Sequence, residues 1–487
     1  MELLVKEIVN AVNGTLLTGS ENQKVTSVGV NSKEIKEGAL FVPIIGERVD
    51  GHQFIRNAFE NGAVASFTSH HKTEKELLED GDLGDTSEWN NRCVIYVEDT
   101  LQALQALGAY YRNLFTLPII GITGSVGKTT TKEMISAALE TKYHVLKTIG
   151  NMNSQIGLPL MMFYLEKDYD VAVIEMGMSE EGEMERLAKI ARPDMAVMTN
   201  IGVSHIGQLG SKENIRKEKL NIINEFRPKS KLFLNGDDTL LLQINPKIEI
   251  PVTEKTAEKL ADTECIFFGT EKACRFYGNN IKTEQGKTYF TLHYPDGTEE
   301  IELSVLGLHN VNNALVALAV AYHLGIKPAM AKEGLRTYQP IAMRGQIFEH
   351  KGIYIIDDTY NASPDSMKSG ISVLLQMPQA KRHIAVLADV LELGEVSHSC
   401  HYEVGSYIAS TKYKEAYTEE VVTIGKEAKA IKEAIETEGK GINARSFNSN
   451  QEAIAYLKTI LKPGDAVLVK GSRGMHTDEI VDKLKAL

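Results

Sequence analysis

Short runs of apolar residues alternate with longer amphipathic segments along most of the chain. From residue 118 onward the runs "PIIGIT", "VAVIEM", "MAVMTNI" and "KLFLN" are almost entirely apolar. Runs of this kind are typical of parallel strands that are buried on both faces of a sheet. The pattern therefore predicts an α/β fold with a mostly parallel sheet in the middle of the chain.

The same rhythm divides the chain into three α/β domains. A small N-terminal domain is expected at 1–98, a central domain at 99–337 and a Rossmann-like domain at 338–487. A connector helix should follow residue 98, with leucines at helical spacing, and end before Pro118. Within the central domain, residues 262–304 are expected to form antiparallel strands. The apolar helix "HNVNNALVALAVAYHLGI" should end near Gly325 and Pro328.

Polar residues end several strands of the third domain. Asp357 and Asp358 follow "IYII", Asp389 follows "HIAVLA", and Lys470 ends "DAVLVK". Ligands of doubly wound sheets bind beyond the carboxyl ends of the strands. We therefore expect ligand-binding residues at this edge of the third sheet.

Composition limits the possible partners. The 487 residues carry a formal net charge of −12, which argues against a broad nucleic-acid surface. No apolar run reaches the roughly 18 to 20 residues of a membrane span, and charges at Glu2, Lys6 and Glu7 interrupt any signal-peptide core. A cytoplasmic protein is expected. Its four cysteines have no metal-binding spacing, so we expect reduced thiols and no zinc site.

The stretch "GITGSVGKTTTKE", residues 121–133, has the features of a phosphate-binding loop. Gly124 and Gly127 let backbone N–H groups approach phosphates, Lys128 supplies a positive charge, and Thr129 can ligate Mg²⁺. The usual GxxxxGK[ST] pattern would have glycine where this chain has Ile122. Because an apolar strand precedes the loop and helix-forming residues follow it, a nucleotide site is the favoured interpretation.

Other polar residues are less informative by themselves. Glu175 ends an apolar strand, and beside a phosphate loop its carboxylate can hold Mg²⁺. His205, Lys219 and Arg344, taken singly, are more typical of structural or solvated positions. The residues alone therefore leave a P-loop phosphohydrolase, a switch protein and a nucleotide-binding scaffold open.

The motifs taken in order resemble the Mur ligase family of ATP-dependent, ADP-forming amide ligases. The phosphate loop matches the TGxxGKT form of that family, which accounts for Ile122. The resemblance spans residues 27 to 475 and rests on "NSKEIKEGALFVPIIGERVDGHQFI", "GNMNSQIGLPL", "EMGMS", "SHIGQLGSKENIRKEK", "GLHNVNNALVALA", "DDTYNASPDSM", "LELG" and "KGSRGM".

The resemblance implies a set of nucleotide and cation ligands. Lys128, Lys219, His205 and Arg344 would be catalytic. Two Mg²⁺ ions are implied, the first held by Thr129 and Glu175 and the second by His205, with Lys219 converted by CO₂ to a carbamate that can bind metal. The ATP-binding residues would be Thr123, Gly124, Ser125, Val126, Gly127, Lys128, Thr129, Thr130, Asn310, Asn313, Arg344 and Asp358.

The resemblance also implies two substrates, UDP-MurNAc-tripeptide and D-alanyl-D-alanine. A monomer is expected. The substrate-binding residues would be Ser32, Asn151, Asn153, Asp389, Lys470, Ser472 and Arg473. The family's "DSR" is Asn31-Ser32-Lys33 here, and its "GDM" is Ala388-Asp389-Val390. Lysine cannot form the bidentate phosphate contact of arginine. Another Mur-type or folylpolyglutamate-type ligase is the nearest alternative.

Overall fold

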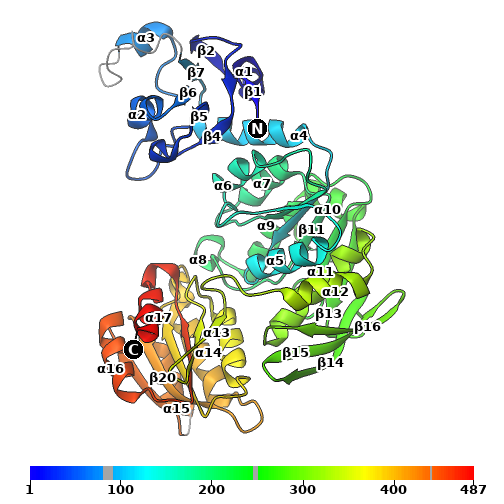
Figure 1. Cartoon of the computed structure of the whole chain (residues 1–487), viewed down its shortest axis with the longest axis vertical. Coiled ribbons are helices and arrows are strands. Elements are labelled where there is room, and N and C mark those ends of the chain that lie inside the picture. Colours follow the sequence, from blue (N-terminus) through cyan, green and yellow to red (C-terminus); the bar gives the residue numbers. More distant parts are fainter. Residues whose placement is uncertain (80–91, 245–249, 439–440, 487) are drawn as a thin grey trace.

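The computed structural model describes residues 1–79, 92–244, 250–438 and 441–486. Figure 1 shows three lobes that follow one another along the chain, from the blue N-terminal lobe through the green central lobe to the yellow-to-red C-terminal lobe. Each lobe is built around its own β-sheet with helices packed against it. The predicted three-domain α/β fold is thus confirmed. The predicted boundaries fall between β7 and α4 and at the end of α12, and they remain predictions.

The N-terminal lobe contains a five-stranded sheet in the order β2-β7-β6-β5-β4. Strands β4 to β7 are parallel to their neighbours, and β2 runs antiparallel to β7. A short antiparallel pair, β1 and β3, lies beside the sheet. The elements are β1 Leu3–Leu4, α1 Val5–Val12, β2 Thr15–Thr18, β3 Lys24–Val25, β4 Ser27–Gly29, β5 Ala39–Phe41, α2 Ile55–Glu60, β6 Ala63–Thr68, α3 Glu74–Glu79 and β7 Cys93–Tyr96.

Helix α4, Thr100–Asn113, is the predicted connector. It begins where the Asp99 carboxylate accepts the backbone N–H groups of Leu101 and Gln102, at 2.8 and 2.9 Å, a capping arrangement that satisfies two otherwise unpaired donors. Its apolar face includes Leu104 and Leu107, which belong to one continuous core with residues of both the N-terminal and the central lobe. The helix therefore joins the two lobes by packing as well as by sequence.

The central sheet has nine strands in the order β16-β15-β14-β13-β12-β11-β8-β10-β9. Strands β8 to β13 are parallel, as the apolar runs predict. The region 262–304 is antiparallel only in β14 to β16; β13 extends the parallel sheet, which differs from the prediction. The strands are β8 Ile119–Thr123, β9 Val145–Lys147, β10 Val171–Glu175, β11 Met195–Met198, β12 Lys231–Asn235, β13 Glu264–Gly269, β14 Phe276–Glu284, β15 Lys287–Tyr294 and β16 Gly297–Leu303.

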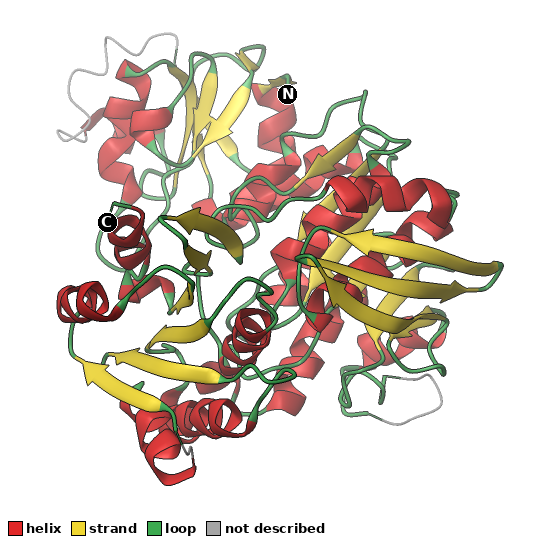
Figure 2. Cartoon of the chain, turned by 60° about the horizontal axis from the view of Figure 1, so that its bottom comes forward, coloured by secondary structure: helices red, strands yellow, loops and turns green. Residues whose placement is uncertain are grey.

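Alternate residues of the central strands face two separate cores, as expected for a sheet covered on both sides. Ile119 belongs to one core and Ile120 to the other, and both are fully buried. Figure 2 shows helices on either side of the central strands. One face carries α5 Lys128–Leu139, α11 Leu308–His323 and α12 Pro328–Thr337, and the other carries α6 Gly157–Met162, α7 Glu183–Ala191, α9 Lys212–Leu220 and α10 Glu254–Ala261.

The C-terminal sheet has six strands in the order β17-β18-β22-β19-β20-β21, parallel except for β17. Its edge strands β17 and β21 were not predicted, because neither contains a fully buried residue and their apolar pattern is weak. The elements are β17 Gln346–His350, β18 Ile353–Asp357, α13 Pro364–Leu375, β19 Arg382–Ala388, α14 Ser397–Ser410, β20 Thr418–Ile424, α15 Lys429–Glu438, β21 Asn443–Phe447, α16 Asn450–Ile460, β22 Asp465–Lys470 and α17 Asp478–Lys485.

Among the described residues, no helix is both long and apolar enough to cross a membrane. All four cysteines are free thiols. Burial raises the pKa of Cys265 and of Cys274 to about 11, so both thiols stay protonated near neutral pH.

Candidate active site

The predicted phosphate loop connects β8 to α5 at the carboxyl edge of the central sheet. Gly124 has φ +149° and Gly127 has φ +84°, conformations that side chains with a Cβ rarely adopt. A Cβ on Gly124 would also overlap the Oγ1 atom of Thr199. The loop leads into the first turn of α5, whose N–H groups have no partner within the helix and favour an anion. The geometry therefore suits the phosphates of a nucleotide.

Asn200, which the sequence analysis did not single out, fixes the shape of this loop. Its side-chain Oδ1 accepts the N–H of Val126 at 2.9 Å, and its carbonyl accepts the N–H of Ser125 at 3.1 Å. The neighbouring Thr199 hydroxyl donates to the Val126 carbonyl at 2.6 Å. Asn200 lies two residues after the apolar run "MAVM", so its place just beyond a strand end was the available signal.

The half-buried Lys128 and the buried Lys219 meet on the same carbonyl of the phosphate loop. The Nζ atoms of Lys128 and Lys219 both donate to the Gly124 carbonyl, at 2.8 and 3.2 Å. Burial lowers the pKa of both amines, and that of Lys219 falls well below its ordinary value, with the charge of Lys128 as the second cause. Lys219 is 1% exposed, so the interpretation of this residue as a solvated helix lysine is wrong.

Glu175 and Thr129 bring two hard oxygen atoms together beside the loop. The Thr129 hydroxyl donates to Glu175 Oε2 at 3.0 Å, and Asn153 Nδ2 donates to Glu175 Oε1 at 2.8 Å. Glu175 is 3% exposed and lines the same cavity as the loop. Neighbouring ligands of an octahedral Mg²⁺ lie about 3 Å apart when each is about 2.1 Å from the ion. The spacing and the oxygen donors therefore fit Mg²⁺.

A cavity of about 1090 Å³ opens above the loop and is walled by the central and C-terminal domains. Asn310 and Asn313 of α11 lie on its central-domain side. Asn313 Oδ1 accepts the Thr131 hydroxyl at 2.9 Å, and its Nδ2 donates to Asn310 Oδ1 at 3.2 Å. The cavity lining also includes Asn151, Asn153 and residues 125–130. Most of the predicted nucleotide ligands thus share one space.

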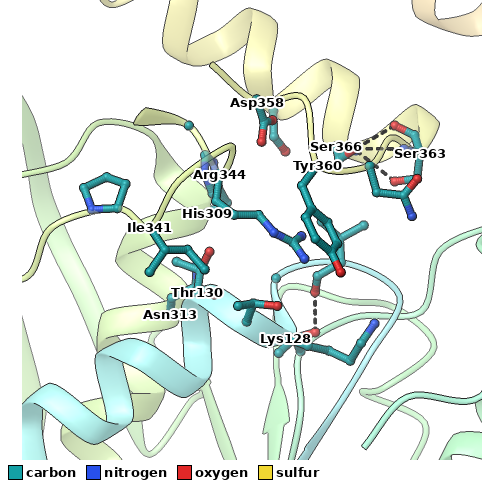
Figure 3. Close-up of a pocket in the computed structure, with 18 of the residues that line it drawn as sticks. Lys128, Thr130, His309, Asn313, Ile341, Arg344, Asp358, Tyr360, Ser363 and Ser366 are labelled. Atoms are coloured by element: carbon teal, nitrogen blue, oxygen red, sulfur yellow. Dashed lines mark hydrogen bonds between the residues drawn. The ribbon is translucent and has the colours of Figure 1, made fainter. Parts of the chain in front are cut away.

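The C-terminal domain supplies the opposite wall. Figure 3 shows Lys128 and Thr130 on the side of α5, and Arg344, Asp358 and Tyr360 across the cavity from them. The Arg344 guanidinium lies 3.7 Å from the centre of the Tyr360 ring, and its Nε has no hydrogen-bond partner among the described residues. Tyr360 was not predicted as a site residue, although it lies in the motif "DDTYNASPDSM". A cation with a free donor therefore faces the phosphate loop.

Lys470 is paired within the C-terminal domain. Its Nζ lies 2.6 Å from Asp358 Oδ2 and donates to the Asn361 carbonyl at 3.0 Å, and the lysine is 2% exposed. Both members of the pair line the cavity. The strand-end residues expected to lie at this edge of the sheet therefore include one ion pair between a buried lysine and a half-buried carboxylate.

His205 lies at the junction of the central and C-terminal domains and lines the cavity. Its Nδ1 is 2.9 Å from Oε2 of Glu392, a residue of the C-terminal domain that the sequence analysis did not select. The hydrogen bond from His205 is the main cause that lowers the pKa of the Glu392 carboxyl. The carboxylate is therefore ionised near neutral pH and accepts a hydrogen bond from the imidazole N–H.

The remaining predicted substrate residues occupy different surroundings. Arg473 lines the cavity and lies 3.3 Å from Asp478. The Ser472 hydroxyl accepts the N–H of Leu391 at 2.9 Å. Ser32, in the N-terminal domain, is 6% exposed. Six of the predicted site residues lie outside the lining of this cavity: Thr123, Gly124, Lys219, Ser32, Asp389 and Ser472.

Asp389 stabilises the C-terminal domain through two hydrogen bonds. Its carboxylate accepts the N–H groups of Ala428 and Lys426, at 2.7 and 3.0 Å, in the segment before α15. Asp389→Ala should leave both donors unpaired and make these amides exchange about 100-fold faster, which corresponds to about 3 kcal/mol. Hydrogen–deuterium exchange of this segment measures the effect. Asp389→Asn retains one acceptor and should show an intermediate rate; unchanged exchange in both variants would contradict the prediction.

A second group of possible metal ligands, Asp50, His52 and His70, lies in the N-terminal domain. His52 uses both ring nitrogens: Nδ1 lies 2.6 Å from Asp50, and Nε2 accepts the N–H of Ser69 at 3.0 Å. The rings of His52 and His70 stack in parallel, 3.8 Å apart, so their in-plane lone pairs do not converge. The group therefore organises the loop of residues 44–54 and is poorly arranged for a metal.

The three α/β domains, with a phosphate loop in the central one, define a nucleotide-binding enzyme of the P-loop class. Family models match three segments of the chain: the Mur ligase middle domain at residues 122–321, the Mur ligase glutamate ligase domain at 343–473, and the Mur ligase family catalytic domain at 24–112. The chain belongs to the Mur ligase family.

Individual relatives match over nearly the whole chain. The UDP-N-acetylmuramoyl-tripeptide--D-alanyl-D-alanine ligase of Bacillus subtilis (strain 168) is 36% identical over 482 residues, which cover 99% of this chain and 98% of the relative. The crystal structure of MurF from Acinetobacter baumannii has a TM-score of 0.85 and 27% identity, covering 100% and 99% of the two chains. MurF ligase from Thermotoga maritima, in complex with ADP, has a TM-score of 0.79 and 29% identity over 95% and 97%.

Proposed function

We propose that the protein is an ATP-dependent ligase that joins D-alanyl-D-alanine to UDP-MurNAc-tripeptide, with ADP and phosphate as the other products. The observation that carries this proposal is the single cavity in which a phosphate loop faces a second α/β domain with its own cation, Arg344. The relatives that match almost the whole chain bear the name of this activity, which supports the choice of substrates.

The reaction needs an activated carboxylate, because an ionised carboxylate does not condense with an amine near neutral pH. Transfer of the γ-phosphoryl group of ATP to the carboxylate gives an acyl phosphate, and the amine then attacks its carbonyl and expels phosphate. The first step brings two anions together, so the site must supply positive charge. Lys128, the N-terminus of α5 and Arg344 would supply it, since Lys128 and Arg344 line one cavity.

Thr129 and Glu175 would hold the first Mg²⁺, since their oxygen atoms already have the spacing of neighbouring ligands. The ion would supply charge neutralisation at the β- and γ-phosphates. Thr123 to Thr130 would enclose the phosphates, and Asn310 and Asn313 would contact the adenine. Asp358 would fix the C-terminal domain against the nucleotide.

Lys219 would act as a carbamate, and with His205 it would hold a second Mg²⁺. Only the neutral amine of lysine reacts with CO₂, and burial lowers the pKa of Lys219 well below its ordinary value. The structure brings its Nζ to the back of the phosphate loop, against the Gly124 carbonyl. A carbamate there would place a negative charge beside Lys128 and replace a repulsion by an attraction.

The C-terminal domain would keep water from the acyl phosphate and deliver the amine. Arg473 and the edge formed by Lys470 and Ser472 would face D-alanyl-D-alanine, with Asp389 bracing the adjoining loop. Asn151 and Asn153 would face the UDP-sugar peptide, and Ser32 would lie at the first-domain site for its UDP group.

A coupled assay of ADP release tests the proposed function. ADP should form only when ATP, UDP-MurNAc-tripeptide and D-alanyl-D-alanine are all present, in equal amounts with the ligated product. A phosphohydrolase or switch protein would release ADP without a carboxylate substrate. Equal ADP release with either substrate omitted would refute the ligase, and turnover with another amine or acid substrate would indicate a different member of the family.

A further inference from the structure

The contact between His205 and Glu392 joins two domains through residues with unusual backbone conformations. His205 has φ +62° and Glu392 has φ +70°, in the left-handed region that residues other than glycine rarely adopt. Strain of this kind is unfavourable and persists where surrounding structure enforces it. Two such residues hydrogen-bonded to each other across a domain boundary indicate a contact with a function.

The backbones on either side approach closely at two glycines. Gly207 belongs to α8, Ile206–Leu209, and Gly394 follows Glu392 by two residues in the C-terminal domain. A Cβ on Gly207 would lie 3.1 Å from the Glu392 carbonyl oxygen, and one on Gly394 would lie 3.4 Å from the Gly207 Cα. Larger side chains at these positions would separate the two segments and withdraw Glu392 from His205.

The loop that carries Glu392 is braced from within its own domain. The Val390 N–H donates to Nε2 of His401 at 3.0 Å, and the Leu391 N–H donates to the Ser472 hydroxyl at 2.9 Å. His401 is fully buried, and its Nδ1 donates to the Ser397 carbonyl at 2.7 Å. Both nitrogens are therefore satisfied in one neutral tautomer. Glu392 thus extends from a fixed loop.

We propose that Glu392 is a positioning residue that orients His205 for the second cation, and so couples binding of that cation to docking of the C-terminal domain. The carboxylate accepts a hydrogen bond from Nδ1–H, which leaves the lone pair of Nε2 available as the ligand atom of a residue that lines the cavity. This inference rests on the proposed function, which assigns His205 to the second Mg²⁺.

Cation binding and domain docking are coupled because His205 and Glu392 belong to different domains. His205 belongs to the central domain, which carries the phosphate loop, and Glu392 belongs to the C-terminal domain. Any cation that binds better to the oriented imidazole must favour the docked arrangement by the same free energy, because linkage is reciprocal. Docking therefore prepares the second cation site.

Mn²⁺ binding in the presence of a nonhydrolysable ATP analogue tests the proposal without any turnover. Electron paramagnetic resonance counts the bound ions of the full chain. Glu392→Ala should weaken the affinity for the second Mn²⁺ by about 10- to 100-fold, the usual effect of removing such a carboxylate partner. The affinity for the first Mn²⁺, at Thr129 and Glu175, should be unchanged. Glu392→Gln keeps an acceptor oxygen and should recover part of the loss.

Two further variants separate orientation from a general loss of structure. Gly207→Val leaves His205 and Glu392 intact but separates the segments that carry them. It should therefore weaken binding of the second ion as Glu392→Ala does. Glu395→Ala removes an exposed carboxylate three residues away and should bind both ions normally. In a His205→Ala background, Glu392→Ala should cause no additional loss.

The outcomes distinguish this inference from the proposed function. Two Mn²⁺ ions with unchanged affinities in Glu392→Ala would overturn the positioning role and leave the ligase intact. A wild-type protein that binds one Mn²⁺ would overturn the second cation site together with this inference. ADP release that depends on both substrates would still support the ligase in either case.

Discussion

Lys128→Ala is expected to lower the kcat of ligation by at least about 10³-fold, the order of effect seen when a cation that stabilises phosphoryl transfer is removed. Its amine donates to the Gly124 carbonyl, and burial of the amine lowers its pKa. Anionic phosphates would favour its charged form and draw the proton-bearing amine to the γ-phosphate. Coupled ADP assays at saturating substrate measure the effect.

Lys189→Ala is the matched control for Lys128→Ala. Lys189 lies on the surface helix α7 with a side chain 57% exposed, so its removal should change neither activity nor folding. Circular dichroism of both variants checks that the fold is retained. A correctly folded Lys128→Ala variant with kcat within tenfold of the wild type would contradict the assignment of the phosphate loop.

Lys219→Ala is expected to be nearly inactive and to regain part of its activity when a small carboxylate such as acetate is added. The substitution removes both the carbamate and most of a long buried side chain, so acetate has space to bind near the phosphate loop. The carbamate itself is visible by NMR after incubation with ¹³C-labelled CO₂. The wild type should show one carbamate carbon signal that the variant lacks.

Lys217→Ala, two residues away on the same helix, is the control for Lys219→Ala. It should keep full activity and the carbamate signal. A fully active Lys219→Ala variant would refute the catalytic role of this lysine. If the Lys219→Ala variant is inactive but the wild type shows no carbamate signal, Lys219 acts as an amine.

The chemistry that depends on local sequence could be predicted, and the chemistry that depends on tertiary packing could not. The strand, the glycines and Lys128-Thr129 of the phosphate loop are contiguous, so their pattern alone indicates a nucleotide site. Lys219 shows the limit. Its neighbours on α9 are mostly charged, and only the packing of that helix behind the loop buries its amine.

The contacts between domains are still harder to predict from the sequence. Nothing near Glu392 indicates that it reaches His205, because the contact depends on how two domains dock. The roles of Asn200 and Tyr360 likewise depend on tertiary contacts. Asn200 contacts the Val126 carbonyl of the phosphate loop, and Tyr360 contacts the Arg344 guanidinium. The fold was easier to predict. Continuous apolar runs indicate the buried strands, whereas the half-exposed edge strands β17 and β21 have no such run.

In the proposed reaction, the terminal phosphate of ATP passes to a substrate carboxylate before it is released. Isotope transfer tests this step. UDP-MurNAc-tripeptide with ¹⁸O in its terminal carboxylate is incubated with ATP, D-alanyl-D-alanine and the enzyme, and the released phosphate is analysed by mass spectrometry. One ¹⁸O atom should appear in each phosphate formed, because the carboxylate oxygen leaves with it. Phosphate without ¹⁸O, formed in step with the amide, would contradict the acyl phosphate.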